Sequence, residues 1–269
     1  MKKGLIVNKY TISLLILLTI LGVDILLHKG MSRTILPASF TTKRSPQTGL
    51  SHCNSSLLIH NKKWLKAINN TALAASIDST VSGIEMDLYF DTAKNVFFVY
   101  HDTLVISNTT IEEILAVLSH KKLHPSLWLD VKNLSEANEK YALQALLNIK
   151  NKFELNKRVL VESPQIARLR SFCDSGFYTS FYTPFFNPYN EPEETLVAKI
   201  DSITALLKKY PVSALSGYYF QAPFLMKFFP EFPILTWAAN DKMSFVSTVF
   251  HYRLQHEKQI AIVLYSPEN

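Results

Sequence analysis

Glycine and cysteine are scarce in this chain, which has 7 glycines and 2 cysteines among 269 residues. Two cysteines, Cys53 and Cys173, are too few for a disulfide framework, so they leave the redox compartment open. No stretch is of low complexity, and 48% of the residues are hydrophobic, which excludes a disordered or fibrous chain. The length suffices for one large domain or two small ones.

A Gly-rich phosphate-binding loop is also missing, and short apolar runs instead alternate with amphipathic stretches from residue 50 onward. This alternation is typical of parallel β-α-β units. Helices are expected at 110–120, 134–153 and near 58–76, 192–209, 222–229 and 241–257. Strands are expected at 49–54, 83–90, 95–102, 126–132, 158–164, 178–184, 215–221, 233–240 and 260–267.

These elements predict a (β/α)8 barrel, a TIM barrel, over residues 49–269. The range 95–102 is taken as an extra strand, because only a short turn separates it from 83–90. An open doubly wound sheet is the main alternative. Such a sheet would usually carry a Gly-rich loop after its first strand, and this chain has none.

One hydrophobic run, residues 10–28, stands apart from the barrel and is nearly long enough to span a bilayer. We predict a single-pass transmembrane anchor there, preceded by a basic flank at 1–9 and followed by a linker at 29–48. Lysines before the run favour an inside N-terminus and a barrel on the extracytoplasmic side, although basic residues also follow it. A signal peptide is the alternative. The first 45 residues are expected to be dispensable for folding.

The formal net charge of +6 raises the question of an anionic partner. The basic residues are scattered and many flank the hydrophobic run, so no concentrated basic stripe predicts nucleic-acid binding. Attraction to anionic lipid headgroups explains the charge with fewer assumptions. We therefore expect a membrane partner and no nucleic acid.

Acidic residues lie where two predicted strands end. Residues two apart on a strand share a face, so Glu85 and Asp87 point together, as do Asp130 and Lys132. The carboxyl ends of barrel strands form the mouth, where barrel active sites are built. Glu85, Asp87 and Asp130 offer oxygen ligands that suit Mg²⁺ or Ca²⁺. Pairing of each acid with a Lys or Arg is the alternative, and three converging acids favour the metal.

Two histidines also stand at strand ends. His52 ends the first predicted strand and His101 ends the extra strand, and such a pair across a metal can act as general base and general acid. Asn54 shares the face of His52 and is a candidate ligand, or else a loop residue. Lys132 is a candidate for holding a phosphate oxygen, or for balancing charge. Cys53 alternates away from His52 and is expected to be a small core residue.

In this order the elements resemble the phospholipase C-like phosphodiesterase superfamily, which includes glycerophosphodiester phosphodiesterases, sphingomyelinase D-type enzymes and the menorin family. The glycerophosphodiester pattern has a His ending its first strand, then Glu-x-Asp, His-Asp, acid-x-Lys and a late Thr-Trp-x-x-Asn. The corresponding elements here are His52, "EMD" at 85–87, "HD" at 101–102, "DVK" at 130–132 and "TWAAN" at 236–240.

The sequence departs from that pattern at its first motif, where "HCN" stands in place of His-Arg-Gly and the following Glu-Asn-Thr is missing. Its "H-x-N-S" form and the later "WLDVKN" resemble the menorin branch more closely. The fourth element carries Asp130 where a Glu is usual. The resemblance implies metal ligands Glu85, Asp87 and Asp130, catalytic residues His52 and His101, and substrate-binding residues Asn54, Lys132 and Trp237.

The resemblance further implies a metal-dependent phosphodiesterase. Aromatic stretches at 177–190 and 218–232 fall in loops over the expected barrel mouth, where they either pack in the core or receive an acyl chain. Together with the predicted anchor they favour a glycerophosphodiester or a lysophospholipid as substrate. A catalytically inactive barrel that binds lipid headgroups or a protein partner is the alternative.

Overall fold

The computed structural model of the protein describes residues 8–27, 40, 42–101, 104, 106–238 and 244–267. Residues 1–7 of the predicted basic flank, residue 28 of the predicted anchor, and residues 29–39 and 41 of the predicted linker lie outside this range. So do Asp102 of the "HD" motif and Asn240 of the "TWAAN" motif.

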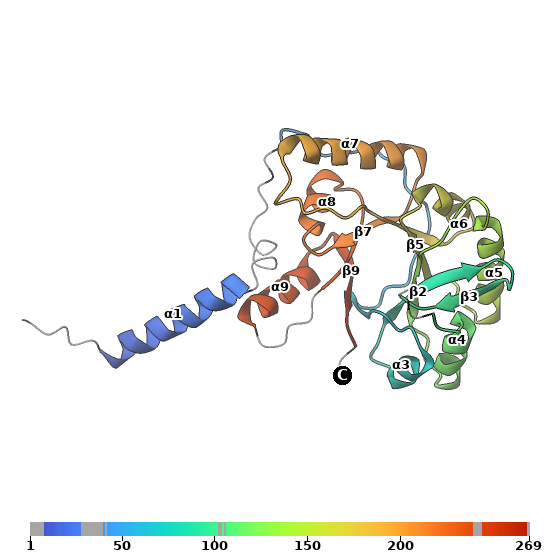
Figure 1. Ribbon diagram of the computed structural model, residues 1–269, viewed down its shortest axis with the longest axis horizontal. Coiled ribbons are helices and arrows are strands. Elements are labelled where there is room, and N and C mark those ends of the chain that lie inside the picture. The colour runs from blue at the N-terminus through green and yellow to red at the C-terminus, as the bar shows by residue number, and fades with distance from the viewer. Residues whose placement is uncertain are drawn as a thin grey trace, which may run out of the picture.

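Parallel strands form a closed barrel, as the sequence predicts (Figure 1). The strands are β1 (Lys63–Leu65), β2 (Gly83–Asp91), β4 (Ser126–Val131), β5 (Val159–Ser163), β6 (Tyr178–Tyr182), β7 (Ala214–Tyr218), β8 (Ile234–Trp237) and β9 (Ile260–Tyr265). The barrel closes because β1 pairs in parallel with both β2 and β9. The ninth strand, β3 (Val96–Val99), pairs antiparallel with β2 and is the predicted extra strand.

Helices follow most strands and surround the barrel (Figure 1). They are α3 (Thr71–Ser76), α4 (Ile111–His120), α5 (Glu139–Lys152), the 3₁₀ turn η1 (Ile166–Leu169), α6 (Arg170–Asp174), α7 (Glu193–Lys209), α8 (Ala222–Phe228) and α9 (Phe245–His256). The start of α4 is the predicted capping box, in which Thr110 N–H donates to Glu113 Oε2 at 2.7 Å and Glu113 N–H donates to Thr110 Oγ1 at 3.3 Å.

The barrel has two apolar layers, one between the strands and the helices and one inside the strands. The inner layer centres on two fully buried tryptophans, Trp64 and Trp128. A Cβ atom at Gly83 would overlap the indole of Trp64, so this glycine permits the close approach of β1 to β2. Leu57 and Ile59 pack against the same layer, so the segment before β1 contributes to the inner core.

The first predicted strand, 49–54, is wrong, and the helix predicted near 58–76 is confirmed only at its end, where α3 covers Thr71–Ser76. Residues 50–62 form no regular strand or helix, and β1 lies inside the predicted helix. His52 forms an isolated bridge with Val212, just before β7, and Leu58 N–H donates to Lys157 O, just before β5, at 2.7 Å. The segment therefore crosses the amino ends of the strands. Residues 50–62, here called the floor segment, alternate in hydrophobicity because one side of the segment packs against the amino ends of the barrel strands. Strand β1 has only three residues and is too short to show a period.

Cys53 and Cys173 form a disulfide, with their Cα atoms 5.8 Å apart. Cys53 is buried, as expected, but it is not a free thiol. The bond joins the floor segment to α6. Two cysteines allow only one intrachain pair, but the sequence does not show that residues 120 positions apart lie within bonding distance.

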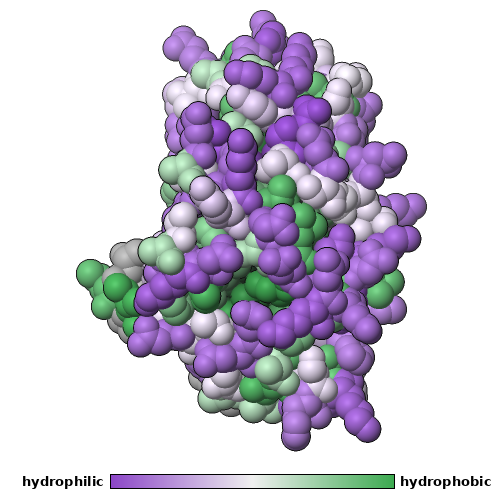
Figure 2. All heavy atoms as spheres, turned by 90° about the vertical axis from the view of Figure 1, so that its right-hand side faces the viewer, coloured by the Kyte–Doolittle hydropathy of each residue, from purple (hydrophilic) through white to green (hydrophobic). Residues whose placement is uncertain are grey.

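Helix α1 (Lys9–Leu27) is long and apolar enough to cross a membrane, and a signal sequence near the N-terminus shares this length and composition. It projects from the barrel beside α9 (Figure 1), where Val246 N–H donates to Asp24 Oδ2 at 3.0 Å. The opposite side of the barrel is mostly hydrophilic (Figure 2), as expected for helices whose outer faces meet water.

The described part of the predicted linker lies against the barrel. Phe40 is buried, and its ring packs on that of Phe224 with centroids 5.6 Å apart. Arg44 forms an ion pair with Asp201 of α7, and Gln47 N–H donates to Phe228 O at 2.8 Å. Residues 42–48 are thus held by contacts with α7 and α8.

Candidate functional site

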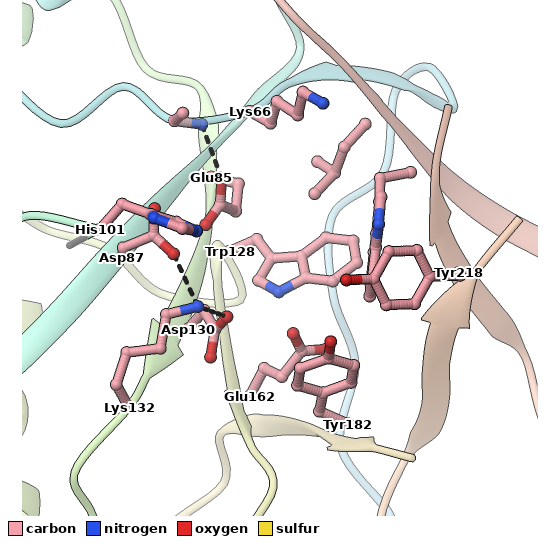
Figure 3. Close-up of a pocket in the computed structure, with 13 residues that line it drawn as sticks. Lys66, Glu85, Asp87, His101, Trp128, Asp130, Lys132, Glu162, Tyr182 and Tyr218 are labelled. Atoms are coloured by element: carbon pink, nitrogen blue, oxygen red, sulfur yellow. Dashed lines mark hydrogen bonds and ion pairs between the residues drawn. The ribbon is translucent and has the colours of Figure 1, made fainter. Parts of the chain in front are cut away.

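A cavity of about 370 Å³ is lined by residues at the carboxyl ends of the barrel strands (Figure 3). Its position is that of the active site in barrel enzymes. The lining residues are Lys66, Ala67, Glu85, Asp87, His101, Trp128, Asp130, Lys132, Glu162, Tyr182, Tyr218, Trp237 and Leu264. Six of the eight predicted site residues are therefore in one pocket.

The three predicted metal ligands meet on one side of this pocket. Each offers a carboxylate oxygen, and these oxygens all lie within 4.8 Å of one another. The side chains come together because Asp87 of β2 and Asp130 of β4 are register partners, while Glu85 lies two residues earlier on the same face of β2. All three residues are buried.

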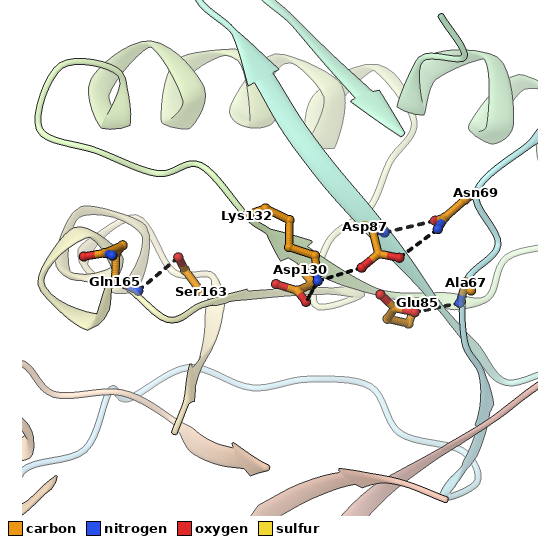
Figure 4. Close-up of polar contacts among 8 residues, drawn as sticks. All are labelled: Ala67, Asn69, Glu85, Asp87, Asp130, Lys132, Ser163 and Gln165. Atoms are coloured by element: carbon orange, nitrogen blue, oxygen red, sulfur yellow. Dashed lines mark hydrogen bonds and ion pairs between the residues drawn. The ribbon is translucent and has the colours of Figure 1, made fainter. Parts of the chain in front are cut away.

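Residues just after β1 hold two of these acids in place (Figure 4). Ala67 N–H donates to Glu85 Oε2 at 2.6 Å. The Asn69 side chain donates from Nδ2 to Asp87 Oδ2 at 2.7 Å, and its Oδ1 accepts from Asp87 N–H at 3.0 Å. The turn after β1 thus fixes the carboxylates before any ligand binds.

Lys132 bridges Asp87 and Asp130. Its Nζ donates to Asp87 Oδ1 at 2.7 Å and also to Asp130 Oδ2. Burial alone lowers the pKa of Lys132, but the neighbouring Asp130 and Asp87 outweigh burial and raise the pKa above its ordinary value. The ammonium group is therefore charged at neutral pH.

The acids themselves are harder to ionise than isolated carboxyl groups. Burial, reinforced by the charge of Asp87, raises the pKa of Glu85 to about 8. Burial likewise raises the pKa of Asp130, against the opposing effect of Lys132. Burial is the main cause of both shifts, and the surplus of negative charge from the neighbouring acids adds to it.

This excess of charge fits a divalent cation. Three carboxylates with one lysine leave two uncompensated negative charges when all are ionised. Asp130 Oδ1 is buried and has no hydrogen-bond partner within the described part of the chain. A set of oxygen ligands that includes this unpaired oxygen suits Mg²⁺ or Ca²⁺, with water or substrate oxygens completing the coordination. The cluster could therefore hold a metal ion, whose identity the geometry leaves open.

Of the two predicted catalytic histidines, only His101 lines the pocket. It lies just beyond β3, on the same side as Glu85 and Asp87 (Figure 3). His52 instead stacks on Phe232, with ring centroids 4.1 Å apart, beside the amino end of β8. His52 and the exposed Asn54 belong to the floor segment, so the predicted placement of both beside the acids is wrong.

Lys66 takes the position at the end of the first barrel strand that the resemblance assigns to a histidine. It follows Leu65 directly and lines the pocket next to Ala67. Its ammonium group forms no hydrogen bond or ion pair with other described residues. Sequence reasoning missed Lys66 because its short strand lay within a predicted helix.

Sequence reasoning also missed Glu162, although the signal was available. Glu162 lies near the carboxyl end of β5, where the alternation argument that selected Glu85 and Asp87 applies equally. It is 2% exposed and lines the pocket. Burial, with a further contribution from Asp130, raises the pKa of Glu162 well above its ordinary value.

Aromatic side chains form the remaining wall of the pocket (Figure 3). Trp237, a predicted substrate-binding residue, packs against Tyr218 and Tyr182 with ring centroids 4.7 Å and 5.4 Å away. Trp128 lies between these rings and the acidic cluster. Tyr182 ends β6 and Tyr218 ends β7, whereas the predicted strands 178–184 and 215–221 continue beyond both tyrosines.

No model of a known protein family matches the sequence, and no curated protein matches it either. Solved structures do match the fold. A protein of Silicibacter pomeroyi assigned as a glycerophosphoryl diester phosphodiesterase aligns with 81% of this chain and 93% of its own, at 15% identity and a TM-score of 0.53. One of Galdieria sulphuraria assigned as a glycerophosphodiester phosphodiesterase aligns with 78% and 95%, at 13% identity and a TM-score of 0.52.

A phosphodiesterase of Oleispira antarctica, solved with its product sn-glycerol-3-phosphate, aligns with 77% of this chain and 93% of its own, at 11% identity and a TM-score of 0.50. At these identities the likeness concerns the fold. The chain has the barrel fold of glycerophosphodiester phosphodiesterase structures, as the motif order predicts, and the branch is left open.

Proposed function

We propose that the protein is a membrane-anchored, metal-dependent phosphodiesterase that cleaves glycerophosphodiesters or lysophospholipids. The observation that carries the proposal is the acidic cluster of Glu85, Asp87 and Asp130 with Lys132 at the mouth of a barrel with this fold. A phosphodiester is anionic, so a cluster of acids can bind it only through a cation.

Glu85, Asp87 and Asp130 would hold Mg²⁺ or Ca²⁺. When bound, the metal neutralises charge on the nonbridging phosphate oxygens as the phosphorus is attacked. Lys132, held between Asp87 and Asp130, offers an ammonium donor on the same side of the pocket. These charges lower the barrier most when they are fixed in advance, and the hydrogen bonds from Ala67 and Asn69 do fix them.

His101 is the proton-transfer group in this proposal, since it lines the pocket beside the acids. It takes a proton from the attacking hydroxyl group or gives one to the leaving oxygen. Lys66, on the adjacent strand end, supplies a second ammonium group for the phosphate in place of a second histidine. Attack by water and attack by a neighbouring substrate hydroxyl are both compatible with one histidine.

Three features support a membrane protein with its barrel on the extracytoplasmic side. Helix α1 has the length and composition of a membrane span. The disulfide between Cys53 and Cys173 favours an oxidising compartment, because such bonds are rare in reducing cytosol. Phe185, in the loop after β6, is 63% exposed and is suited to an acyl chain or the membrane interface.

A catalytically inactive barrel that binds lipid headgroups is the second candidate. The observation in its favour is the displacement of His52 to the barrel floor, which leaves His101 as the one histidine that lines the pocket among the described residues. Such a barrel would retain the metal and the ligand but would not turn the ligand over.

The deciding experiment uses the full chain in maltoside micelles with Mg²⁺ or Ca²⁺. Glycerophosphocholine, glycerophosphoinositol and lysophosphatidylcholine are supplied, and the released products are identified by mass spectrometry. We expect turnover of at least one substrate, abolished by EDTA. Asp87→Asn should weaken metal binding in calorimetry and lower kcat by at least about a hundredfold. Glu136→Gln, which changes an exposed acid, is the matched control. Metal-dependent ligand binding without turnover would favour the second candidate.

A further inference from the structure

Glu162 is a buried acid with a place of its own in the pocket. Its register partner in β4 is Asp130, yet it is not among the three acids whose oxygens lie within 4.8 Å of one another. Its side chain is 2% exposed, and Oε2 has no hydrogen-bond partner among the residues that the structure describes. A buried carboxylate oxygen without a donor is costly, so a group that binds there should bring positive charge.

The surroundings of Glu162 are aromatic rather than basic (Figure 3). Trp128 and Tyr182 lie on either side of its carboxylate, and Tyr218 lies beyond them. Trp237 also lines the pocket and packs against both tyrosines. The rings stand steeply to one another, at 79° for Tyr182 with Trp237 and 64° for Tyr218 with Trp237. Rings in this arrangement present several faces to one volume, which is how proteins hold quaternary ammonium groups.

The charges of the pocket support the same conclusion. The two charges of a divalent cation and the charge of Lys132 neutralise the three carboxylates of the acidic cluster. The negative charge of Glu162 then has no counterpart among these groups. Lys66, the other lysine of the pocket, lies on the opposite side from Glu162 (Figure 3). A singly charged organic cation would complete the balance.

We infer that Glu162 with Trp128, Tyr182, Tyr218 and Trp237, here called the aromatic subsite, binds the quaternary ammonium group of a choline-type phosphodiester. The inference rests on the proposed function, which places the phosphate at the acidic cluster, and it selects choline esters over neutral inositol esters. Aromatic faces attract a desolvated cation, and the carboxylate supplies the opposite charge. A cavity of about 370 Å³ accommodates a headgroup of this size.

Binding of choline itself tests the subsite independently of catalysis. Choline and its neutral isostere 3,3-dimethylbutan-1-ol are titrated into the full chain in maltoside micelles containing saturating Mg²⁺, with tryptophan fluorescence and calorimetry as readouts. We expect choline to bind about tenfold or more tightly than the isostere. Equal binding of the two, or binding of neither, would overturn the inference. Tighter binding of ethanolamine than of choline would overturn the choice of a quaternary cation.

Two variants that each remove one carboxylate of the pocket locate the choline site. Glu162→Gln should abolish the preference for choline over its isostere while Mg²⁺ binding is kept. Asp87→Asn should weaken Mg²⁺ binding while the choline preference is kept. The inference fails if Glu162→Gln binds choline as the parent does, or if it loses Mg²⁺ as Asp87→Asn does, since Glu162 would then be a metal ligand.

Turnover separates this inference from the function on which it rests. The ratio of kcat/KM for glycerophosphocholine over glycerophosphoinositol should exceed about ten in the parent and fall toward one in Glu162→Gln. Cleavage of both substrates at equal rates would leave the phosphodiesterase intact and overturn the subsite. Choline binding through Glu162 without any turnover would keep the subsite and overturn the phosphodiesterase.

Discussion

His101 and His52 occupy opposite ends of the barrel, and this separation gives the first prediction. His101→Ala should lower kcat about a hundredfold to ten-thousandfold, the usual contribution of a positioned acid or base. His52→Ala should leave kcat within about twofold of the parent value, because His52 packs on Phe232 away from the pocket. Steady-state kinetics with the best substrate provides the measurement. Equal losses in both variants would contradict the assignment.

Glu85 gives a prediction about pH. Its pKa is about 8 in the metal-free folded protein against an ordinary 4.5. Between these values the folded protein keeps a proton that the unfolded chain has lost, so the free energy of unfolding falls as pH rises. The melting temperature in EDTA should therefore drop from pH 5 to pH 8. Saturating Mg²⁺ should reduce this drop, and so should Glu85→Gln. If the melting temperature changes equally with pH in all three samples, the raised pKa of Glu85 is refuted.

At this scale, strand alternation predicts much of the site. It correctly groups Glu85, Asp87, Asp130 and Lys132, because each stands on the inward face at a strand end. The same rule applies to Glu162. The rule fails for Lys66, since a strand of three residues shows no period, and the lysines within and beside β1 obscure its apolar signal.

Among the elements, the floor segment and α6 are joined by the disulfide between Cys53 and Cys173. Cys53→Ser with Cys173→Ser should lower the free energy of unfolding by about 2–4 kcal/mol, since the bond closes a long loop of the unfolded chain. Urea unfolding measures the change. Reduction of the disulfide in the parent protein with dithiothreitol should produce the same loss. Metal binding should persist, because the bond lies at the floor. Loss of metal affinity would indicate that the floor segment helps to position the acidic cluster at the opposite end of the barrel.

The elements themselves were largely predictable. Eight of the nine predicted strands have a counterpart, because apolar strands carry a strong period. Every predicted helix has one too, although only residues 71–76 of the range 58–76 are helical. The floor segment resembles a strand in sequence because its apolar and polar residues alternate, and this alternation arises from packing against the amino ends of the barrel strands. Sequence periodicity reports burial on one face and does not identify the backbone partner.

For the whole molecule, the contacts of Phe40 and Arg44 change the expectation that the first 45 residues are dispensable. A chain that begins at residue 28 should keep the stability of the barrel. A chain that begins at residue 46 should lose about 3 kcal/mol, because it lacks the buried ring of Phe40. Phe40→Ala in the chain beginning at residue 28 is the control and should reproduce most of the loss. Equal melting temperatures in all three would restore the original expectation.

The pairing of β1 with β9 has a consequence for synthesis of the protein. These strands are neighbours in the closed barrel but roughly 200 residues apart in the chain. At about 5–20 residues per second, the ribosome finishes β9 about 10–40 s after β1 emerges. During that interval the growing sheet has an open edge, which is a template for aggregation. We therefore expect a chaperone or the translocation machinery to shield the nascent barrel until its last strand arrives.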